Sequence, residues 1–155
     1  MIEQRLLDVA AALSRRTGRR PREAFMRRAV STAYYALFAA LSRMCANELV
    51  GSKHARTPEW TRVYRALDHG WAKRVLTGRG AAELGEEVAA IGRSFAVLQD
   101  RRHRADYDPS FFGFYFVETT ATVDLARSAI DDLRRLDADS RRALAIHLLF
   151  KDRTA

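Results

Sequence analysis

Residues 26–44 read MRRAVSTAYYALFAALSRM, and this stretch decides the fold class. No Gly or Pro interrupts the chain between Pro21 and about Asn47, so we predict one long helix that begins at Pro21. Its apolar side chains recur at helical spacing, at Met26, Val30, Ala33, Leu37, Leu41 and Met44. Because residues 33–41 are apolar nearly all round, we expect burial on more than one side, by the bundle, a partner subunit, or both.

Helical patterns continue on both sides of this stretch. We predict a helix over residues 3–14 and another from Pro58 toward Leu76, which Gly70 interrupts and Gly78 with Gly80 ends. Further helices are predicted from Leu84 to about Asp108 and from Phe114 to Leu136. A last helix is predicted to begin at a cap formed by Asp139. Residues 111–117 hold four Phe and one Tyr that would also suit a strand, but a single strand has nothing to pair with. The sequence therefore predicts an all-α single domain over residues 1–155, in which short connections make neighbouring helices antiparallel.

Composition limits the function classes. The 155 residues include 27 Lys plus Arg against 19 Asp plus Glu, a net charge of +8, and only three of the basic residues are Lys. Arg-rich basic surfaces attract nucleic acid, although a proteome-wide preference for Arg on solvated helices would give the same count. No apolar stretch is long enough to span a bilayer, and Cys45 is the only cysteine, so we expect a cytoplasmic protein without disulfides.

Residues 100–109 read DRRHRADYDP and carry the chemistry. The helical stripe that ends at Leu98 continues onto Arg102, which places an arginine at an inward position. Asp106 follows Arg102 by four residues, and Tyr107 follows His103 by four, so each pair is expected to share a face. One alternative stays open here: Arg102 pairs with Asp106 at a cation-rich helix end, His103 is solvated, and no ligand binds.

Two segments together, RAVSTAYYALFAAL (28–41) and RHRADYDP (102–109), resemble the HEPN domain family. This resemblance covers about residues 3–137 and implies that they form a bundle of four to five helices, with the C-terminal helix at about 139–151 lying beyond this core. It further implies a homodimer with a basic cleft at its interface, and a toxin-antitoxin or defence role in prokaryotes. It also implies RNA or another phosphate-rich ligand, with metal-independent endoribonuclease activity in the active members. Pairing with a nucleotidyltransferase-like antitoxin, as a non-catalytic interaction module, is the alternative role.

The resemblance assigns the phosphate clamp to Arg102 and the proton-moving position to Tyr107. His103, directly after Arg102, is the alternative proton carrier, so the predicted catalytic residues are Arg102, His103 and Tyr107. Tyr107 stands where active members have His, and the usual tyrosine pKa near 10 makes it a poor base, so we expect weak or absent cleavage. The predicted RNA ligands are Arg28, Ser31, Arg101, Arg104 and Asp106, with Lys53, His54 and Arg56 as phosphate contacts unless their loop is only a polar connection. Tyr34, Tyr35 and Phe38 are expected in the core or at a dimer interface rather than stacked on bases. We expect no cofactor and no metal site.

Overall fold

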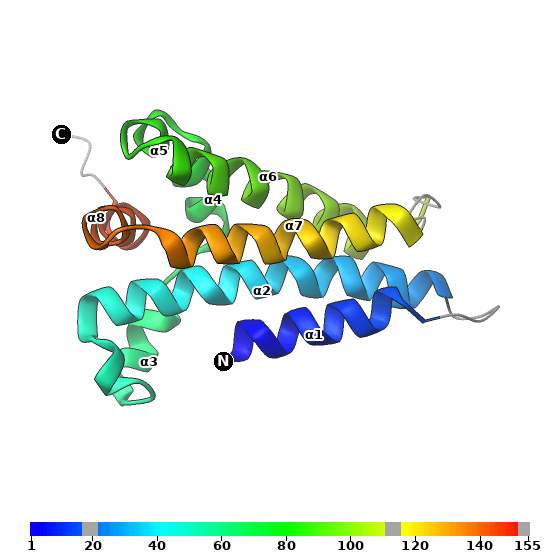
Figure 1. Cartoon of the computed structure of the whole chain (residues 1–155), viewed down its shortest axis with the longest axis horizontal. Coiled ribbons are helices and arrows are strands. Elements are labelled where there is room, and N and C mark those ends of the chain that lie inside the picture. Colours follow the sequence, from blue (N-terminus) through cyan, green and yellow to red (C-terminus); the bar gives the residue numbers. More distant parts are fainter. Residues whose placement is uncertain (17–21, 111–115, 152–155) are drawn as a thin grey trace. The chain divides into compact units, whose positions relative to one another are not determined.

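The computed structural model describes residues 1–16, 22–110 and 116–151, and these residues contain helices but no strand. The all-α prediction is confirmed (Figure 1). The elements are α1 (Ile2–Ser14), α2 (Arg22–Val50), the 3-10 helix η1 (Ser52–His54), α3 (Pro58–Tyr64), α4 (His69–Thr77), α5 (Arg79–Glu83), α6 (Glu86–Tyr107), α7 (Phe116–Arg135) and α8 (Ala138–Leu149). The predicted helix start at Pro21 and most of the aromatic stretch, residues 111–115, lie outside the described residues.

The chain divides into two compact units. The first unit combines Met1–Ala39 with Ser94–Asp131, and the second combines Ala40–Arg93 with Asp132–Ala155. The long helices α2, α6 and α7 each contribute residues to both units. The prediction of one domain over residues 1–155 stays a prediction.

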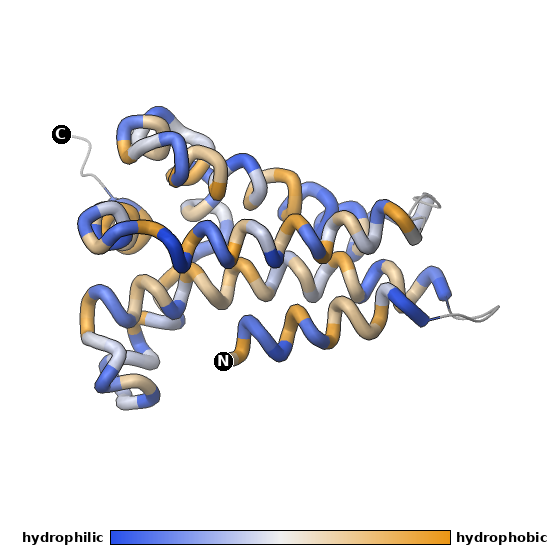
Figure 2. Tube along the Cα trace, in the orientation of Figure 1, coloured by the Kyte–Doolittle hydropathy of each residue, from blue (hydrophilic) through white to orange (hydrophobic). Residues whose placement is uncertain are grey.

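The first unit is built around the N-terminal part of α2. Figure 1 shows α1 running antiparallel to this part of α2, and α7 running antiparallel to α6. Hydrophilic and hydrophobic residues alternate along α1 (Figure 2), and its Leu7 and Ala10 are buried. The rings of Tyr34 and Phe95 pack with their centroids 5.5 Å apart. The core of this unit therefore joins α2 to α6.

The middle of α2 is buried nearly all round, as its composition predicts. Every residue from 29 to 42 is buried except the half-buried Tyr35 and Phe38. Because this burial occurs within one copy of the chain, it requires no partner subunit.

The second unit holds the shorter helices, and three polar caps set where they begin. Thr57, Asp68 and Asp137 each accept a hydrogen bond from a backbone N–H in the first turn, at the starts of α3, α4 and α8. The α4 helix contacts both α5 and α8.

Three predicted helix limits are wrong in this unit. The helix expected from Pro58 toward Leu76 is two helices, because the chain leaves the first after Tyr64 and Asp68 starts the second, so Gly70 lies inside α4 instead of interrupting it. Gly78 does end α4, but Gly80 lies inside the additional helix α5. The last helix is capped by Asp137, and Asp139 lies in its first turn.

Candidate functional site

The C-terminal end of α6 packs against α2 in the first unit and brings several predicted site residues together. Arg102 and Asp106 come from α6, and Ser31 and Tyr35 come from α2. These four residues, with Tyr107, are called the Arg102 cluster. The predicted inward position of Arg102 is confirmed, since its side chain is 23% exposed.

Arg102 is held by one hydrogen bond and one ion pair. Its Nη2 donates to the Tyr35 hydroxyl at 2.8 Å, and its Nε lies 2.9 Å from Oδ2 of Asp106 without hydrogen-bond geometry. Burial acts to lower the pKa of Arg102. The neighbouring Tyr35 and Asp106 outweigh burial, so the pKa of Arg102 lies above its usual value and the guanidinium stays charged.

Aromatic rings surround the guanidinium. Its central carbon lies 5.4 Å from the ring centroids of Tyr35 and Tyr107, and 5.9 Å from that of Tyr34. Cation–π contacts of this kind favour a fixed guanidinium orientation. Tyr34, which is fully buried, therefore belongs to the core as predicted, while the hydroxyl of Tyr35 reaches the site.

Asp106 balances the charge of the cluster. Its Oδ2 accepts a hydrogen bond from the Ser31 hydroxyl at 3.2 Å, and the same oxygen contacts Arg102. The predicted i to i+4 pair of Arg102 and Asp106 is thus present. An anionic ligand that approaches Arg102 must compete with this carboxylate.

His103 and Tyr107 form an exposed pair beside Arg102. Their ring centroids lie 5.0 Å apart, as the four-residue spacing predicts, and Tyr107 is 62% exposed. Both rings are therefore accessible to a ligand bound at the cluster.

Arg27 is a residue of this region that the sequence reasoning missed. Its Nη1 donates to the backbone carbonyls of Ala105 at 3.0 Å and Asp108 at 2.8 Å, and more weakly to that of Arg104 at 3.4 Å. The carbonyl of Arg104 already accepts the backbone N–H of Asp108, whereas that of Ala105 has no N–H four residues on, because residue 109 is Pro. Arg27 therefore caps the end of α6 from α2. The sequence holds only part of the signal: Arg27, Ser31 and Tyr35 recur every four residues on one face of α2, but their spacing does not show that this face meets the end of α6.

The other predicted ligands of the first unit lie outside the cluster. Arg101 donates to the hydroxyl of Thr122 on α7 at 2.7 Å, so it ties α6 to α7. Arg28 and Arg104 are exposed, one on each helix. Beyond the end of α6, the Ser110 hydroxyl and backbone N–H bond the carboxylate of Asp108 and lower its pKa.

Lys53, His54 and Arg56 belong to the second unit. Lys53 and His54 lie in η1, and all three residues are exposed. Arg56 has a φ of 74°, in the left-handed region that few side chains favour. These three residues are therefore not part of the Arg102 cluster.

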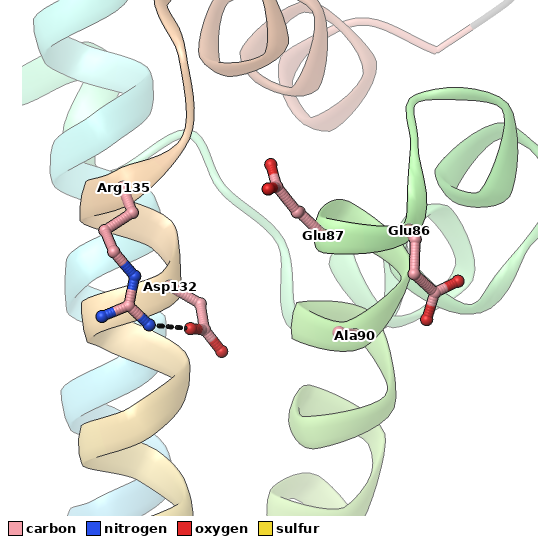
Figure 3. A pocket seen from close by; sticks show the side chains of 5 residues that line it. All are labelled: Glu86, Glu87, Ala90, Asp132 and Arg135. Carbon is pink, nitrogen blue, oxygen red and sulfur yellow. Dashed lines mark hydrogen bonds and ion pairs between the residues drawn. The ribbon is translucent and has the colours of Figure 1, made fainter.

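A pocket in the second unit has the wrong charge for a phosphate. It is lined by Glu86, Glu87 and Ala90 of α6 and by Asp132 and Arg135 of α7 (Figure 3). Arg135 is ion-paired with Asp132, and Oε1 of Glu86 lies 2.5 Å from Nη2 of Arg93. Since its single cation is neutralised, this pocket repels anions.

Other chemistry has little support in the described part of the chain. Among residues 1–16, 22–110 and 116–151, no group of three or more His, Cys, Asp or Glu could hold a metal ion. Cys45 is buried, and burial raises the pKa of its thiol to about 12. None of the described helices is long and apolar enough to cross a membrane.

Comparisons of this chain with protein family models, with curated proteins and with solved structures give no match.

Proposed function

We propose that this protein binds RNA at the Arg102 cluster, as a cytoplasmic helical protein of the HEPN type with weak or absent endoribonuclease activity. The observation that carries the proposal is the half-buried guanidinium of Arg102, oriented by Tyr35 and Asp106 beside the exposed His103 and Tyr107. A fixed guanidinium fork matches the geometry of a phosphate, and little side-chain entropy is lost when it binds. The net charge of +8 supplies long-range attraction for a polyanion.

The same geometry supports the proposal of weak cleavage. Cleavage without a metal needs a group that takes the proton of the ribose 2′-hydroxyl and another that protonates the leaving oxygen. His103 and Tyr107 are the exposed candidates nearest to Arg102. The Asp106 carboxylate already compensates the charge of Arg102, which reduces the stabilisation available to a developing phosphorane. Binding is therefore the main role in this proposal.

A second candidate function is pairing with a partner protein, such as a nucleotidyltransferase-like antitoxin. Exposed apolar side chains favour it. Ile146 and Phe150 are 52% and 56% exposed and lie four residues apart at the end of α8. Exposed apolar groups on one face are typical of protein-binding surfaces. In this alternative the protein is the non-catalytic, toxin-like half of a pair.

The RNA proposal is tested by titrating a labelled single-stranded RNA with three variants. Arg102→Ala is expected to raise Kd at least about tenfold, or about 1.4 kcal/mol, because it removes the phosphate clamp. Arg102→Lys keeps the charge but loses the fork, so an intermediate Kd is expected. Arg142→Ala is the matched control, since it removes one exposed arginine of α8, and it is expected to change Kd by less than about twofold.

Thermal unfolding of each variant verifies that the fold is intact. A Kd that is the same for wild type and a folded Arg102→Ala protein contradicts the proposed site. Incubation of the RNA with both proteins in the presence of a chelator tests cleavage, and equal background cleavage would show that the site only binds.

A further inference from the structure

One short part of the second unit is strongly basic. Residues 51–80 contain seven Lys or Arg and only two Asp or Glu, so this part carries a net charge of +5. This segment comprises η1, α3 and α4 with their connections and the first two residues of α5, and all of it belongs to the second unit. It is called the basic-aromatic segment. Its cations are Lys53, Arg56, Arg62, Arg65, Lys73, Arg74 and Arg79.

These cations are available to a ligand. All seven are exposed, and none forms an ion pair with another residue in the described part of the chain. Arg102 differs, because Asp106 neutralises it within the fold. A polyanion therefore gains more from the cations of the segment than from a cation that already has a carboxylate partner.

The segment also contains both tryptophans of the chain. The ring of Trp60 stacks on that of Tyr64, with centroids 5.1 Å apart and an interplanar angle of 21°. The indole N–H of Trp60 donates to Oδ1 of Asn47 at 2.9 Å, which fixes the ring in place. Both rings are half-buried, so a pre-organised aromatic pair sits among exposed cations. Such a combination is typical of surfaces that bind single-stranded nucleic acid.

Trp71 has a different environment. Its indole N–H donates to the carbonyl of His147 at 3.1 Å, and Arg74 and Lys151 lie 5.8 Å and 5.2 Å from its ring centroid. The ring therefore already has two cations as neighbours. Trp71 supports the positive charge of the segment, whereas Trp60 is the better partner for a base.

The exposed side chains favour a nucleic acid over a bilayer. Peripheral binding to an acidic membrane surface is strengthened by bulky apolar side chains that insert among the lipids. None of the large hydrophobic residues that are exposed in the described chain falls within residues 51–80. Charge with half-exposed aromatic rings, but without exposed aliphatic groups, favours a nucleic acid.

We propose that the basic-aromatic segment is a second binding surface for single-stranded RNA. In this proposal, Lys53, Arg62 and Arg65 contact backbone phosphates, and the stacked pair of Trp60 and Tyr64 takes a base. This inference rests on the proposed function, which supplies RNA as the ligand. The surface itself shares no residue with the Arg102 cluster.

The first test compares two triple variants that lose the same charge. The segment variant is Lys53→Ala, Arg62→Ala and Arg65→Ala. The matched control is Arg5→Ala, Arg15→Ala and Arg22→Ala, three exposed arginines of the first unit. Each is titrated with a fluorescein-labelled 20-nucleotide oligouridylate at several salt concentrations, and circular dichroism verifies folding. The logarithm of the association constant falls linearly with the logarithm of the salt concentration, by about 0.7 per phosphate contact. Loss of three contacts is therefore expected to make this negative slope shallower by about 2, whereas the slope of the control stays the same as that of wild type.

The second test follows tryptophan fluorescence. A stacked base quenches the indole, so Trp71→Phe, which keeps only Trp60, is expected to lose emission when oligouridylate is added. Trp60→Phe, which keeps only Trp71, is expected to respond little. Equal responses of these two variants, or equal slopes for the two triple variants, would overturn the proposal. Binding to phosphatidylserine vesicles without binding to oligouridylate would also overturn it.

The two proposals fail in different ways. If Arg102→Ala binds as wild type while the segment triple variant is weakened, the Arg102 site is wrong and the segment stands. The reverse result removes the segment and leaves the Arg102 cluster.

Discussion

At the scale of single residues, Gly92 sets how closely α6 approaches α4 in the second unit. A Cβ added to Gly92 would lie 1.9 Å from the carbonyl oxygen of Leu76 and 2.9 Å from its carbonyl carbon. Both contacts are to backbone atoms, so they are relieved only if one helix moves.

Gly92→Ala is therefore expected to lower the free energy of unfolding by about 1–3 kcal/mol through overpacking. Gly80→Ala is the matched control, because a Cβ there meets no atom within 4 Å and Ala favours the helix by up to about 1 kcal/mol. Urea unfolding of both variants measures the difference. Equal stabilities would show that α4 and α6 do not approach each other this closely.

Single residues of the candidate site were partly predictable. The periodicity of α6 predicted that Arg102 lies inward and that Asp106 lies next to it, because both follow from spacing within one helix. The role of Arg27 did not follow, since Arg27 and Arg28 are adjacent arginines. Only the position of α6 determines which one caps it. Contacts between helices far apart in the sequence are the part that periodicity leaves undetermined.

At the scale of elements, the end of α6 depends on a side chain of another helix. Arg27 is 19% exposed and donates to carbonyls that no residue of α6 itself satisfies. Arg27→Ala is expected to lower the free energy of unfolding by about 2 kcal/mol, since it removes charge-assisted hydrogen bonds and leaves partly buried carbonyls without a partner. Arg28→Ala, an exposed neighbour, is expected to change it by less than about 0.5 kcal/mol. Equal losses for the two variants, measured by chemical denaturation, would contradict the capping role.

The start of α8 gives a prediction for pH. The backbone N–H and the hydroxyl of Ser140 each bond the carboxylate of Asp137 at 2.8 Å and lower its pKa. A lowered pKa in the folded state means that the stabilisation is present above the usual aspartate pKa and is lost as the pH falls through the folded value.

Asp137→Asn keeps a capping side chain but cannot ionise. We therefore expect the variant to have a lower Tm than wild type near neutral pH. This difference in Tm is expected to disappear as the pH falls below about 4. The other carboxylates titrate in both proteins, so the comparison isolates Asp137. A difference in Tm that does not depend on pH would show that the charge contributes nothing to the cap.

Element limits were predictable where one residue type decides them, and less so elsewhere. Thr57 followed by Pro58 marked the start of α3 correctly. Between α3 and α4 the apolar pattern continues through Leu67, so the break was expected at Gly70, whereas the capping side chain of Asp68 places it earlier. Both a capping side chain and a glycine can mark the point where one helix ends and the next begins. Between α3 and α4 the hydrogen bond of the Asp68 cap sets this point, and Gly70 does not.

At the scale of the whole molecule, the all-α class followed from the sequence because helical periodicity runs through nearly every segment. The division into two units did not follow, since α2, α6 and α7 show no break where they pass from one unit to the other. The homodimer stays a prediction of the family resemblance. The apolar middle of α2 no longer supports it, because one copy of the chain buries that stretch.

The placement of the aromatic residues gives the two units different optical signals. Trp60 and Trp71 both lie in the second unit, while Tyr34, Tyr35 and Tyr107 lie in the first. An unfolding curve recorded by tryptophan emission therefore follows the second unit alone, whereas far-ultraviolet circular dichroism follows helices of both. Coincident midpoints identify one cooperative transition, and separate midpoints identify two.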